Sequence, residues 1–478
     1  MLSITKCPTV YSLAQLDEET EADNADNADN AVPRARTSIK DIVGNKVHLY
    51  KFAKKRTVDT KLTKVRSFGS FDDVLEPEDN SDQATSLDTS ELGTAAKAGS
   101  RSGSGSGSRS GSGSGTTTTR GSRSSGDEAN LSSDSDDTNS DSSIKFSHQS
   151  LLDSLTIAEW ESKMEQGLFR YDVTSCPTHV MPGNFGFIAQ LNEGRAAKKR
   201  PTEFQVDKVI QAFDDGKFNF CKAGQNEILF TFEEQQDEHS NVEFEEAFVV
   251  AGSPNLVMIN VSPIEYGHVL LVPRVLDKLQ QLVTPDTLLL ALQFAHEANN
   301  PYLRVGYNSL GAYATINHLH FQAYYLSAAM PLERARTELI AKKKHGKSTI
   351  RVERLVDYPV NGLVFESSGD LEDTATLIGG FCQRLAAKNI PHNMLIVDKG
   401  ARVFILPNAF SQRKARKELP EDILESQVDP AVFEISGHQL MKRREDYEGM
   451  DEAWVVRLLR CACFDEERFD EVIDLCLL

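Results

Sequence analysis

The chain has 478 residues, 40% of them hydrophobic, which is enough for one large folded domain or two of moderate size. Its 52 lysines and arginines against 71 aspartates and glutamates give a formal net charge of −19, which argues against a general nucleic-acid-binding protein. No run approaches the roughly 20 apolar residues that cross a bilayer, and residues 1–16 lack the apolar core of a secretory signal. We therefore expect no nucleic-acid or membrane partner and a cytoplasmic location, with the nucleus as an alternative.

The first 149 residues differ in composition from the rest of the chain. Residues 17–30 are acidic and repeat Ala-Asp-Asn, a basic patch covers residues 51–66, and residues 99–125 are almost wholly Ser, Gly, Thr and Arg. Such sequence cannot bury enough apolar surface to offset its chain entropy, so residues 1–149 are predicted to be a disordered, low-complexity N-terminal region. The basic patch is interpreted as a solvated tail, with a nuclear-import or docking segment as the alternative.

Folded character begins at Ser150, and three helices are marked after it. Ser150 is a candidate N-cap for an amphipathic helix, which the spacing of apolar residues over 151–168 predicts. A second helix begins with Thr284 as its cap and Pro285 in its first turn. A third runs over residues 371–387 and ends before a proline.

Between these helices lie runs that are typical of strands: residues 255–259, 268–272, 303–307, 318–326, 394–397 and 402–406. The strands and helices interleave without a regular βαβ rhythm, and there is no G-x-G-x-x-G phosphate loop. This order predicts, for residues 150–478, a mixed α+β domain built on an antiparallel sheet with flanking helices.

A short sequence echo predicts that this domain has two related halves. Val-Met-Ile at 257–259 is followed by Gly-His-x-Leu at 267–270, and Val-Phe-Glu-Ile at 432–435 is followed by Gly-His-x-Leu at 437–440. Each copy then continues to arginine. Such self-similarity fits two related units packed together.

The candidate catalytic segment is His-Leu-His-Phe-Gln at residues 318–322. In a strand, side chains alternate with period two, so His318, His320 and Gln322 would project from one face while the residues between them point into the core. Three polar groups on one face are costly to bury without partners, and two imidazoles and an amide can converge on a single phosphate. A hydrogen-bonded core pair or a metal site is the alternative, because imidazole is a common metal ligand.

Two further groups are candidates for phosphate contacts. Residues 307–315 are rich in small and hydroxyl side chains, which let donors approach anionic oxygens closely, and here the candidates are Asn308, Ser309 and Thr315. The second is a cationic group that can neutralise phosphate charge by charge-assisted hydrogen bonds: Arg195, Lys198, Lys199 and Arg200. An exposed loop is the alternative for the cationic group.

Residues 260–274 read Asn-Val-Ser-Pro-Ile-Glu-Tyr-Gly-His-Val-Leu-Leu-Val-Pro-Arg, and H-x-H-x-Q follows at 318–322. This pattern resembles the histidine-triad superfamily. Gln322 stands where hydrolase members of that superfamily carry His, which is similar to the galactose-1-phosphate uridylyltransferase branch. By analogy Asn260 would meet the ribose or its neighbourhood. His268 is a further nucleotide-binding candidate, with satisfaction of a backbone carbonyl as the alternative.

Longer segments resemble the plant-type GDP-L-galactose phosphorylase family. They are Phe-Arg-Tyr-Asp-Val-Thr at 169–174, Gly-Phe-Ile-Ala-Gln-Leu-Asn-Glu-Gly-Arg at 186–195, Lys-Arg-Pro-Thr-Glu-Phe at 199–204, Thr-Ile-Asn-His-Leu-His-Phe-Gln-Ala-Tyr-Tyr-Leu at 315–326 and Glu-Ile-Ser-Gly-His at 434–438. The resemblance extends over residues 150–475 and leaves out the Ser/Gly tract.

The resemblance implies a mechanism. His320, the middle residue of the triad, would attack the α-phosphorus of a GDP-hexose and release hexose 1-phosphate, and inorganic phosphate would then attack the guanylyl-histidine to give GDP. His318 would orient His320. Gln322 can donate a hydrogen bond to a phosphate oxygen but cannot act as a general acid or base, which disfavours activation of water. Uridylyltransferases use the equivalent of His318 as a zinc ligand, but this chain lacks the accompanying cysteine pair, so no metal or other cofactor is expected.

The leading hypothesis is phosphorolysis of GDP-L-galactose, which feeds ascorbate synthesis. Phosphorolysis of GDP-D-glucose is an alternative of the same chemistry. A triad-type nucleotide hydrolase is a second alternative, against which Gln322 argues, and a non-catalytic GDP-sugar-sensing protein is a third. The expected partners are a GDP-hexose and inorganic phosphate, and a homodimer is left open because related transferases are dimers.

Overall fold

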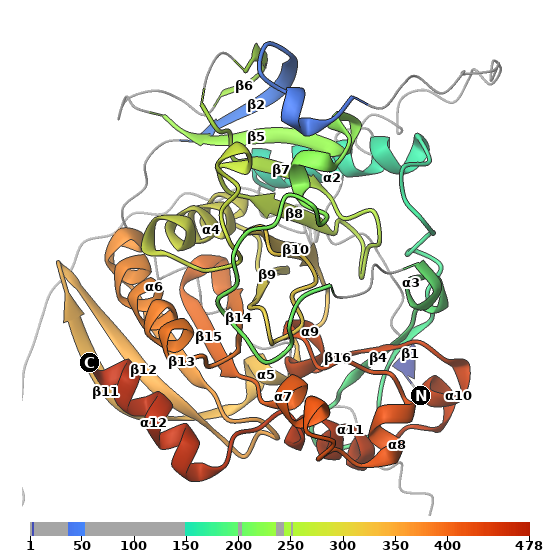
Figure 1. The fold of residues 1–478 in the computed structure, drawn as a ribbon, viewed down its shortest axis with the longest axis vertical. Helices are drawn as coiled ribbons and strands as arrows, with labels where there is room; N and C mark the ends of the chain where they lie inside the picture. The colour runs from blue at the N-terminus through green and yellow to red at the C-terminus, as the bar shows by residue number, and fades with distance from the viewer. Residues whose placement is uncertain (1, 4–36, 53–148, 199–202, 236–242, 250–251) are drawn as a thin grey trace, which may run out of the picture. The chain divides into compact units, whose positions relative to one another are not determined.

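A computed structural model describes residues 2–3, 37–52, 149–198, 203–235, 243–249 and 252–478. The described strands form two sheets (Figure 1). The large sheet has this spatial order: β11 (Arg336–His345), β12 (Ser348–Val356), β13 (Leu363–Ser367), β15 (Arg402–Pro407), β14 (His392–Val397), β9 (Leu303–Asn308), β10 (Phe321–Tyr325), β8 (Val269–Val272), β7 (Leu256–Ile259), β5 (Ile228–Glu234), β2 (Lys46–Phe52) and β6 (Glu243–Phe248). The small sheet has the order β1 (Leu2–Ser3), β3 (Thr178–Val180), β4 (Ile188–Leu191) and β16 (His438–Met441).

The described helices surround these sheets. The α-helices are α2 (Leu151–Glu165), α3 (Glu193–Lys198), α4 (Pro285–Ala298), α5 (Pro331–Arg334), α6 (Leu371–Ala387), α7 (Phe410–Ala415), α8 (Glu421–Glu425), α9 (Val432–Ile435), α10 (Arg444–Gly449), α11 (Glu452–Arg460) and α12 (Glu466–Leu477). Short 3₁₀ turns are η1 (Ile39–Asp41), η3 (Phe220–Lys222), η4 (Gln225–Glu227), η5 (Val275–Asp277) and η6 (Asp398–Gly400). None of the described helices is both long and apolar enough to span a membrane.

The three helices predicted from the sequence are confirmed, because their ends are set by local signals. The hydroxyl of Ser150 accepts a hydrogen bond from the Asp153 backbone N–H at 3.1 Å and caps α2. α4 begins at Pro285, whose missing N–H costs nothing in the first turn. The Asp370 carboxylate caps α6 by accepting from the Glu372 N–H, and α6 spans the predicted residues 371–387.

Two related halves are visible in the strand order of the large sheet. From the centre outwards, the order β9, β10, β8, β7, β5 is mirrored by β14, β15, β13, β12, β11. All neighbours within these two sets pair antiparallel, and the halves join where β9 pairs with β14. α4 precedes β9 as α6 precedes β14, and the two helices pack against each other. The α+β class, the antiparallel sheet and the flanking helices are therefore as predicted.

The sequence echo that prompted this prediction lies in different elements of the fold. Residues 257–259 belong to strand β7, but residues 432–435 form helix α9. His268 precedes β8 of the large sheet, whereas His438 begins β16, which pairs in parallel with β4 of the small sheet. The sequence echo therefore does not mark the two related halves. The mirrored strand order shows them instead.

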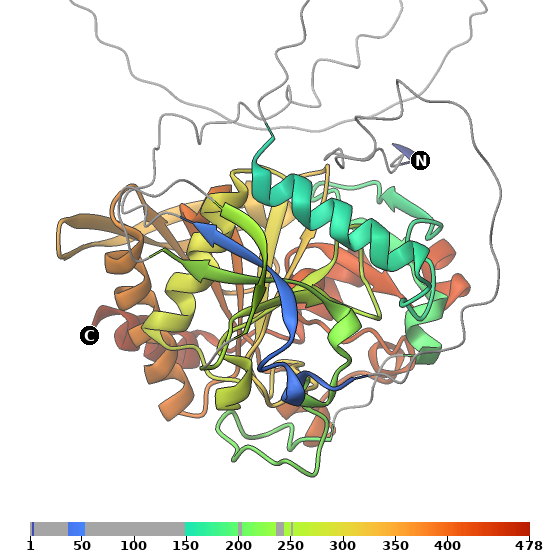
Figure 2. The ribbon, with the colours of Figure 1, turned by 90° about the horizontal axis from the view of Figure 1, so that it is seen from above.

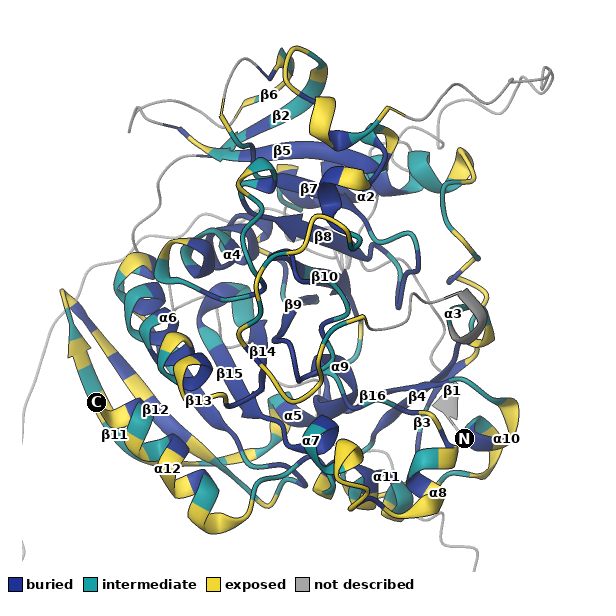
Figure 3. Cartoon of the chain, in the orientation of Figure 1, coloured by how far each residue is buried: buried dark blue, intermediate teal, exposed yellow. Residues whose placement is uncertain are grey.

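The central strands of the large sheet are buried on both faces, whereas the edge strands β6 and β11 are largely exposed (Figure 3). Along β14, Met394 and Ile396 enter one hydrophobic cluster while Leu395 and Val397 enter another, as the period of two requires. The first cluster includes side chains of α2, α4, α6 and α12, and the second includes side chains of α7, α8, α9 and α11. Such burial on both faces explains why the strands read as continuous apolar runs.

The prediction of disorder over residues 1–149 is wrong for residues 37–52, and Leu2–Ser3 forms the short strand β1. Residues 37–52 are folded, and their strand β2 pairs in parallel with β5 and antiparallel with β6 (Figure 2). Tyr50 and Phe52 are buried, and the Phe52 ring stacks on Phe232 at 4.3 Å. These contacts join distant parts of the sequence, so composition alone did not reveal them. Residues 4–36 and 53–148, which include most of the basic patch and the Ser/Gly tract, lie outside the described residues.

Candidate active site

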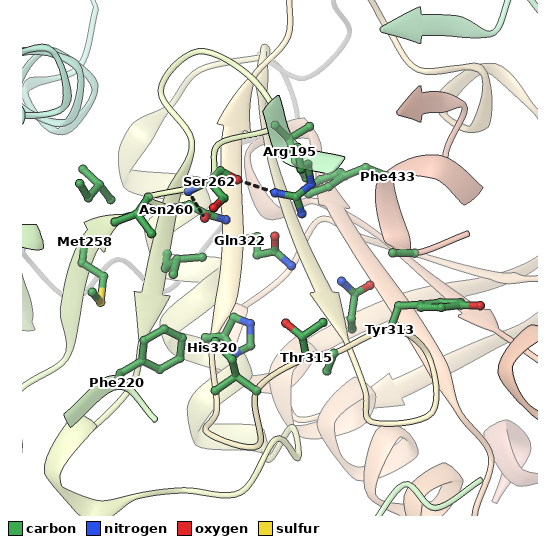
Figure 4. A pocket seen from close by; sticks show the side chains of 18 of the residues that line it. Arg195, Phe220, Met258, Asn260, Ser262, Tyr313, Thr315, His320, Gln322 and Phe433 are labelled. Atoms are coloured by element: carbon green, nitrogen blue, oxygen red, sulfur yellow. Dashed lines mark hydrogen bonds between the residues drawn. The ribbon is translucent and has the colours of Figure 1, made fainter. Parts of the chain in front are cut away.

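A pocket lies where the loop between β9 and β10 approaches the ends of β7 and β8 and helix α9. Figure 4 shows His320 and Gln322 in its middle, Phe220 and Met258 on one side, and Arg195, Tyr313 and Phe433 on the other. The sequence-predicted residues that line it are Arg195, Asn260, Asn308, Thr315, His320 and Gln322. The pocket thus brings together segments that are more than 100 residues apart in the sequence.

His320 is held in one protonation state. Its Nδ1 lies 2.8 Å from the carbonyl oxygen of His318. Because a carbonyl only accepts, Nδ1 carries the proton, and Nε2 of the neutral ring keeps its lone pair. Burial lowers the pKa of His320 to about 4, against a raising effect of the bond to His318. The ring is therefore neutral near pH 7, with an unprotonated Nε2.

Gln281, which the sequence did not mark, fixes the backbone at His320. Its Oε1 accepts from the His320 N–H at 3.0 Å, and its Nε2 donates to the carbonyls of Asn308 and His320 at 2.9 and 3.2 Å. Gln281 is 1% exposed, so these bonds are made out of water. They tie together the start of β10 and the end of β9, and no periodicity or motif in the sequence indicates this role.

The prediction that His318, His320 and Gln322 share one face of a strand is wrong. β10 begins only at Phe321, because residues 318–320 bond to the segment 279–281 instead of a neighbouring strand. His318 does not line the pocket. Its ring is fully buried, and its Nδ1 accepts from the Phe220 N–H at 3.1 Å. Burial lowers the pKa of His318 to about 3, so its ring is neutral near pH 7. The His318 carbonyl therefore holds His320, and the His318 ring holds the backbone of Phe220 in the pocket wall.

His268, predicted as a ligand contact, instead orients Gln322 from behind. His268 is fully buried and does not line the pocket. Its Nδ1 accepts from the Ile264 N–H at 2.8 Å, so its proton is on Nε2. A side-chain hydrogen bond with Gln322 raises the pKa of His268, but burial dominates and lowers it well below the usual value. The proton on His268 Nε2 suits the amide oxygen of Gln322, so we expect the amide nitrogen to face the pocket.

Asn260 and Asn308 are held in the same way as Gln322, by their oxygens. The Oδ1 of Asn260 accepts from the Ser262 N–H at 3.0 Å. The Oδ1 of Asn308 accepts from Asn393 Nδ2 at 2.6 Å and from the Val432 N–H at 2.9 Å. The amide nitrogen of Asn260 lies 3.3 Å from His268 Nε2; both nitrogens carry protons, so this contact is not a hydrogen bond. Each amide therefore presents N–H donors at the pocket, which suits an anionic ligand.

Ser309, also predicted to bind phosphate, shapes the loop instead of lining the pocket. It is fully buried, and its hydroxyl accepts from the His392 N–H at 2.9 Å and donates to the Leu310 carbonyl. Tyr313 in the same loop has a φ of 73°, a conformation that costs free energy for a residue with a Cβ and recurs at functional sites. Tyr313 and Thr315 line the pocket, as Figure 4 shows.

Of the predicted cationic group, Arg195 lines the pocket. A short hydrogen bond joins its Nη1 to the Ser262 carbonyl, and Arg170 supplies a second guanidinium to the lining. Lys199 and Arg200 lie outside the described residues, as does the side chain of Lys198. Arg170 was part of the family resemblance but was not singled out as a site residue.

Other lining residues were not predicted, because neither a strand pattern nor a turn shows which side chains face a pocket. One end of the pocket is apolar, with Phe218, Phe220, Met258, Leu270 and Ile316, and Glu227 is also in the lining. The other end adds Phe433 and Glu434 of α9. Within the described part of the chain, no group of three or more His, Cys, Asp or Glu side chains is arranged to hold a metal ion.

The fold is a mixed α+β protein with two mirrored halves, and the H-x-H-x-Q segment of the first half leads into β10. Two family models match the chain: GDPGP1-like, N-terminal domain over residues 151–324 and GDPGP1-like, C-terminal domain over residues 331–478. The division between them falls between β10 and α5, where the two halves of the sheet meet in the sequence. The chain therefore belongs to the GDPGP1-like family.

Among curated relatives, GDP-L-galactose phosphorylase 1 of Arabidopsis thaliana is 52% identical over 323 residues, which cover 67% of this chain and 72% of the relative. GDP-D-glucose phosphorylase 1 of Homo sapiens is 33% identical over 325 residues, covering 65% of this chain and 79% of the relative. Among solved structures, the yeast Ap4A phosphorylase Apa2 aligns with a TM-score of 0.44 at 14% identity, over 66% of this chain and 98% of that one.

Proposed function

We propose that the chain is a GDP-L-galactose phosphorylase, which transfers GMP from GDP-L-galactose to inorganic phosphate through a guanylyl-histidine. The observation that carries the proposal is the state of His320, a neutral imidazole whose Nδ1–H bonds to the His318 carbonyl. This bond leaves Nε2 as the nucleophilic atom. Relatives named for this activity in Arabidopsis thaliana are 52% and 51% identical to the chain.

In the first step, Nε2 of His320 attacks the α-phosphorus of the GDP-hexose. A P–N bond forms while the bond to the bridging oxygen breaks, and hexose 1-phosphate leaves with the electron pair. The ring becomes cationic, and the His318 carbonyl accepts a stronger hydrogen bond from Nδ1 in that state. In the second step, an oxygen of inorganic phosphate attacks the same phosphorus, the P–N electron pair returns to Nε2, and GDP forms.

The anchored amides support both steps. The donors of Gln322, Asn260 and Asn308 are fixed by bonds to their oxygens before any ligand arrives, so little reorganisation is needed when charge develops on phosphate. The Gln322 amide does not titrate near pH 7, so it cannot act as a general base that deprotonates water. The acceptor is then a preformed anion, inorganic phosphate, which needs no deprotonation to attack.

The two ends of the pocket give the substrate a direction. The apolar end with Phe220 and Met258 suits the nucleobase. The opposite end, with Arg195 and Glu434, suits the charged and hydroxylated hexose phosphate. His320 and Gln322 lie between these ends (Figure 4), where the α-phosphate of such a substrate would be.

The test measures GDP release from GDP-L-galactose with and without inorganic phosphate. We expect phosphate-dependent GDP formation that His320→Asn reduces by at least about 10⁴-fold, while the control variant His345→Asn, at the end of β11 and away from the pocket, keeps full activity. Without phosphate, the wild-type chain should gain the mass of one guanylyl group. GMP formation instead would indicate a hydrolase, and turnover retained in His320→Asn would contradict the mechanism.

The same assay with GDP-D-glucose decides between the two hexoses named for the relatives. We propose preference for GDP-L-galactose because the relatives named for it share 52% identity, against 33% for the human GDP-D-glucose phosphorylase 1. A supply role in ascorbate synthesis, a cytoplasmic or nuclear location and a homodimer stay predictions of the sequence.

A further inference from the structure

Three buried asparagines connect the second half of the large sheet to the pocket by side-chain hydrogen bonds. Asn408 Nδ2 donates to Asn393 Oδ1 at 2.9 Å, and Asn393 Nδ2 donates to Asn308 Oδ1 at 2.6 Å. Asn308 ends β9 and lines the pocket, whereas Asn393 lies in β14 and Asn408 follows β15. Asn393 and Asn408 are fully buried and do not line the pocket. We call these three residues the asparagine network.

Backbone groups fix the orientation of Asn308 and Asn393 in this network. Asn308 Oδ1 also accepts from the Val432 N–H at 2.9 Å, and a backbone N–H can only donate, so this side of the amide is its oxygen. Asn393 Nδ2 also donates to the Ala312 carbonyl at 2.8 Å, and a carbonyl can only accept. Neither amide can turn over without placing donor against donor or acceptor against acceptor, which leaves buried polar atoms unpaired.

Asn408, at the far end of the network, is fixed on both sides of its amide. Its Nδ2 donates to the Pro430 carbonyl at 2.8 Å, and its Oδ1 accepts from the Phe410 N–H at 3.0 Å. Two backbone groups therefore set the orientation of Asn408, which in turn presents a donor to Asn393. The network thus has one direction and ends at the Asn308 oxygen, so the amide nitrogen of Asn308 is turned towards the pocket.

The backbone of Asn308 is tied to the residue that carries the proposed nucleophile. Gln281 Nε2 donates to the carbonyls of Asn308 and His320 at 2.9 and 3.2 Å. Because Gln281 holds the main chain and the asparagine network holds the side chain, the Asn308 donor has a defined place relative to the His320 ring. A donor that is fixed before charge develops on phosphate stabilises that charge more than one that must first reorient.

We propose that Asn393 and Asn408 are positioning residues of the reaction, which act through Asn308 by holding its amide donor towards the α-phosphate. This inference rests on the proposed function, since it concerns a donor of the same pocket. It gives the second half of the domain a part in the reaction, although the H-x-H-x-Q segment belongs to the first half. Removal of a positioning residue should lower kcat, because the Asn308 amide then loses a restraint and adopts the donating orientation less of the time.

The experiment is a double-mutant cycle on phosphate-dependent GDP release from GDP-L-galactose. Asn308→Ala removes the donor and should lower kcat by on the order of 100-fold. Asn393→Leu keeps the donor but removes its restraint, and should lower kcat about 10-fold while KM changes by less than about threefold. In the double variant, Asn393→Leu should cost at most about a further twofold, because no donor is left to position.

Asn300→Ala is the matched control, because this buried amide bonds to Asp153 and to the Tyr302 N–H away from the pocket. It should lower Tm without lowering kcat. Thermal unfolding of every variant shows that it is folded, and if Asn393→Leu does not fold, Asn408→Leu takes its place in the cycle with the same expected result. Losses of kcat that multiply in the double variant, or an unchanged kcat in the single positioning variant, overturn the inference. If the wild type releases no GDP in the presence of phosphate, the proposed function itself fails, so the two failures are distinguishable.

Discussion

Three amide side chains at the pocket are oriented by what lies behind them. Asn260 is bonded to the Ser262 N–H and Asn308 to Asn393, and we expect the oxygen of Gln322 to accept from His268 Nε2–H in the same way. In each case the oxygen is engaged and the nitrogen is left to donate, so the direction of the donors is decided before substrate binds. Such preorganised donors act more strongly in a buried site than in water.

A double-mutant cycle tests whether His268 acts through Gln322. Gln322→Ala should lower kcat by on the order of 100-fold with a smaller change in KM, because the donor matters most as charge develops on phosphate. His268→Phe should lower kcat about 10-fold through loss of the amide's orientation. In the double variant, His268→Phe should add little to the loss from Gln322→Ala, since the two act as one unit.

Stability is measured alongside, because His268→Phe leaves the Ile264 N–H without an acceptor and should cost about 1–3 kcal/mol of unfolding free energy. A purely structural role would give additive losses of kcat in the double variant. Additive losses would therefore contradict the orientation of Gln322 by His268.

The sequence identified six residues that line the pocket: Arg195, Asn260, Asn308, Thr315, His320 and Gln322. For His320 and Gln322, however, it predicted the geometry by the wrong rule. The period of two applies only within a strand, and β10 begins one residue after His320. What holds His320 is Gln281, a residue that comes from a loop and bonds through its side chain. Contacts of this kind depend on tertiary structure, so no local sequence pattern indicates them.

At the scale of elements, α2 is attached to the sheet and to the segment that follows α4 through a buried carboxylate. Asp153, in the first turn of α2, is 1% exposed and accepts from Tyr325 of β10 at 2.7 Å and from Asn300 at 2.6 Å. Burial raises the pKa of Asp153 to about 7, although both hydrogen bonds and the charge of Lys399 lower it. The helix itself was predictable from its cap and apolar spacing, whereas this attachment was not.

The raised pKa of Asp153 makes stability depend on pH. Between about pH 4 and pH 7 the folded chain retains a proton at Asp153 that the unfolded chain releases. The contribution to the free energy of unfolding is therefore full below pH 4 and is lost as the pH rises through 7, by on the order of a few kcal/mol. Asp153→Asn, which stays neutral, should become progressively more stable relative to the wild type over this range.

Urea unfolding of both chains at several pH values between 4 and 8 measures this difference. Buried histidines such as His318 and His392, whose pKa values burial lowers to about 3 and about 4, give the opposite slope below pH 6.5, but they are common to both chains and cancel. A difference in stability that does not change with pH would contradict the raised pKa of Asp153.

At the scale of the whole molecule, the two halves share strand order but not function. The loop between β9 and β10 covers residues 309–320 and carries the pocket residues Tyr313, Thr315 and His320. Its counterpart between β14 and β15 is the short turn 398–401, which contains no histidine. The second half contributes Phe433 and Glu434 to the pocket of the first. Neither half holds the complete pocket, which explains why one motif predicted part of the pocket lining while the far wall was not predictable.

The large sheet also depends on a strand that lies far away in the sequence. β2 is inserted between β5 and β6, the Tyr50 hydroxyl donates to Glu297 of α4 at 3.0 Å, and Phe52 stacks on Phe232. We therefore expect deletion of residues 1–148 to destabilise the fold by several kcal/mol, since exposing even one packed aromatic ring costs about 3–5 kcal/mol. Deletion of residues 66–145 alone leaves β2 in the chain. Because composition indicates that this segment forms no core, its deletion should leave stability unchanged and kcat/KM within about twofold of the full chain.

Thermal unfolding and phosphate-dependent GDP release of the two truncated chains check this expectation, with Phe52→Ala in the full chain as the matched single-site variant. If β2 is integral, Phe52→Ala reproduces part of the loss caused by deletion of 1–148, because both remove the ring that covers Phe232. Equal stability of the two truncated chains would mean that β2 adds nothing to the sheet. A loss of activity on deletion of 66–145 would mean that this segment, despite its composition, takes part in the reaction.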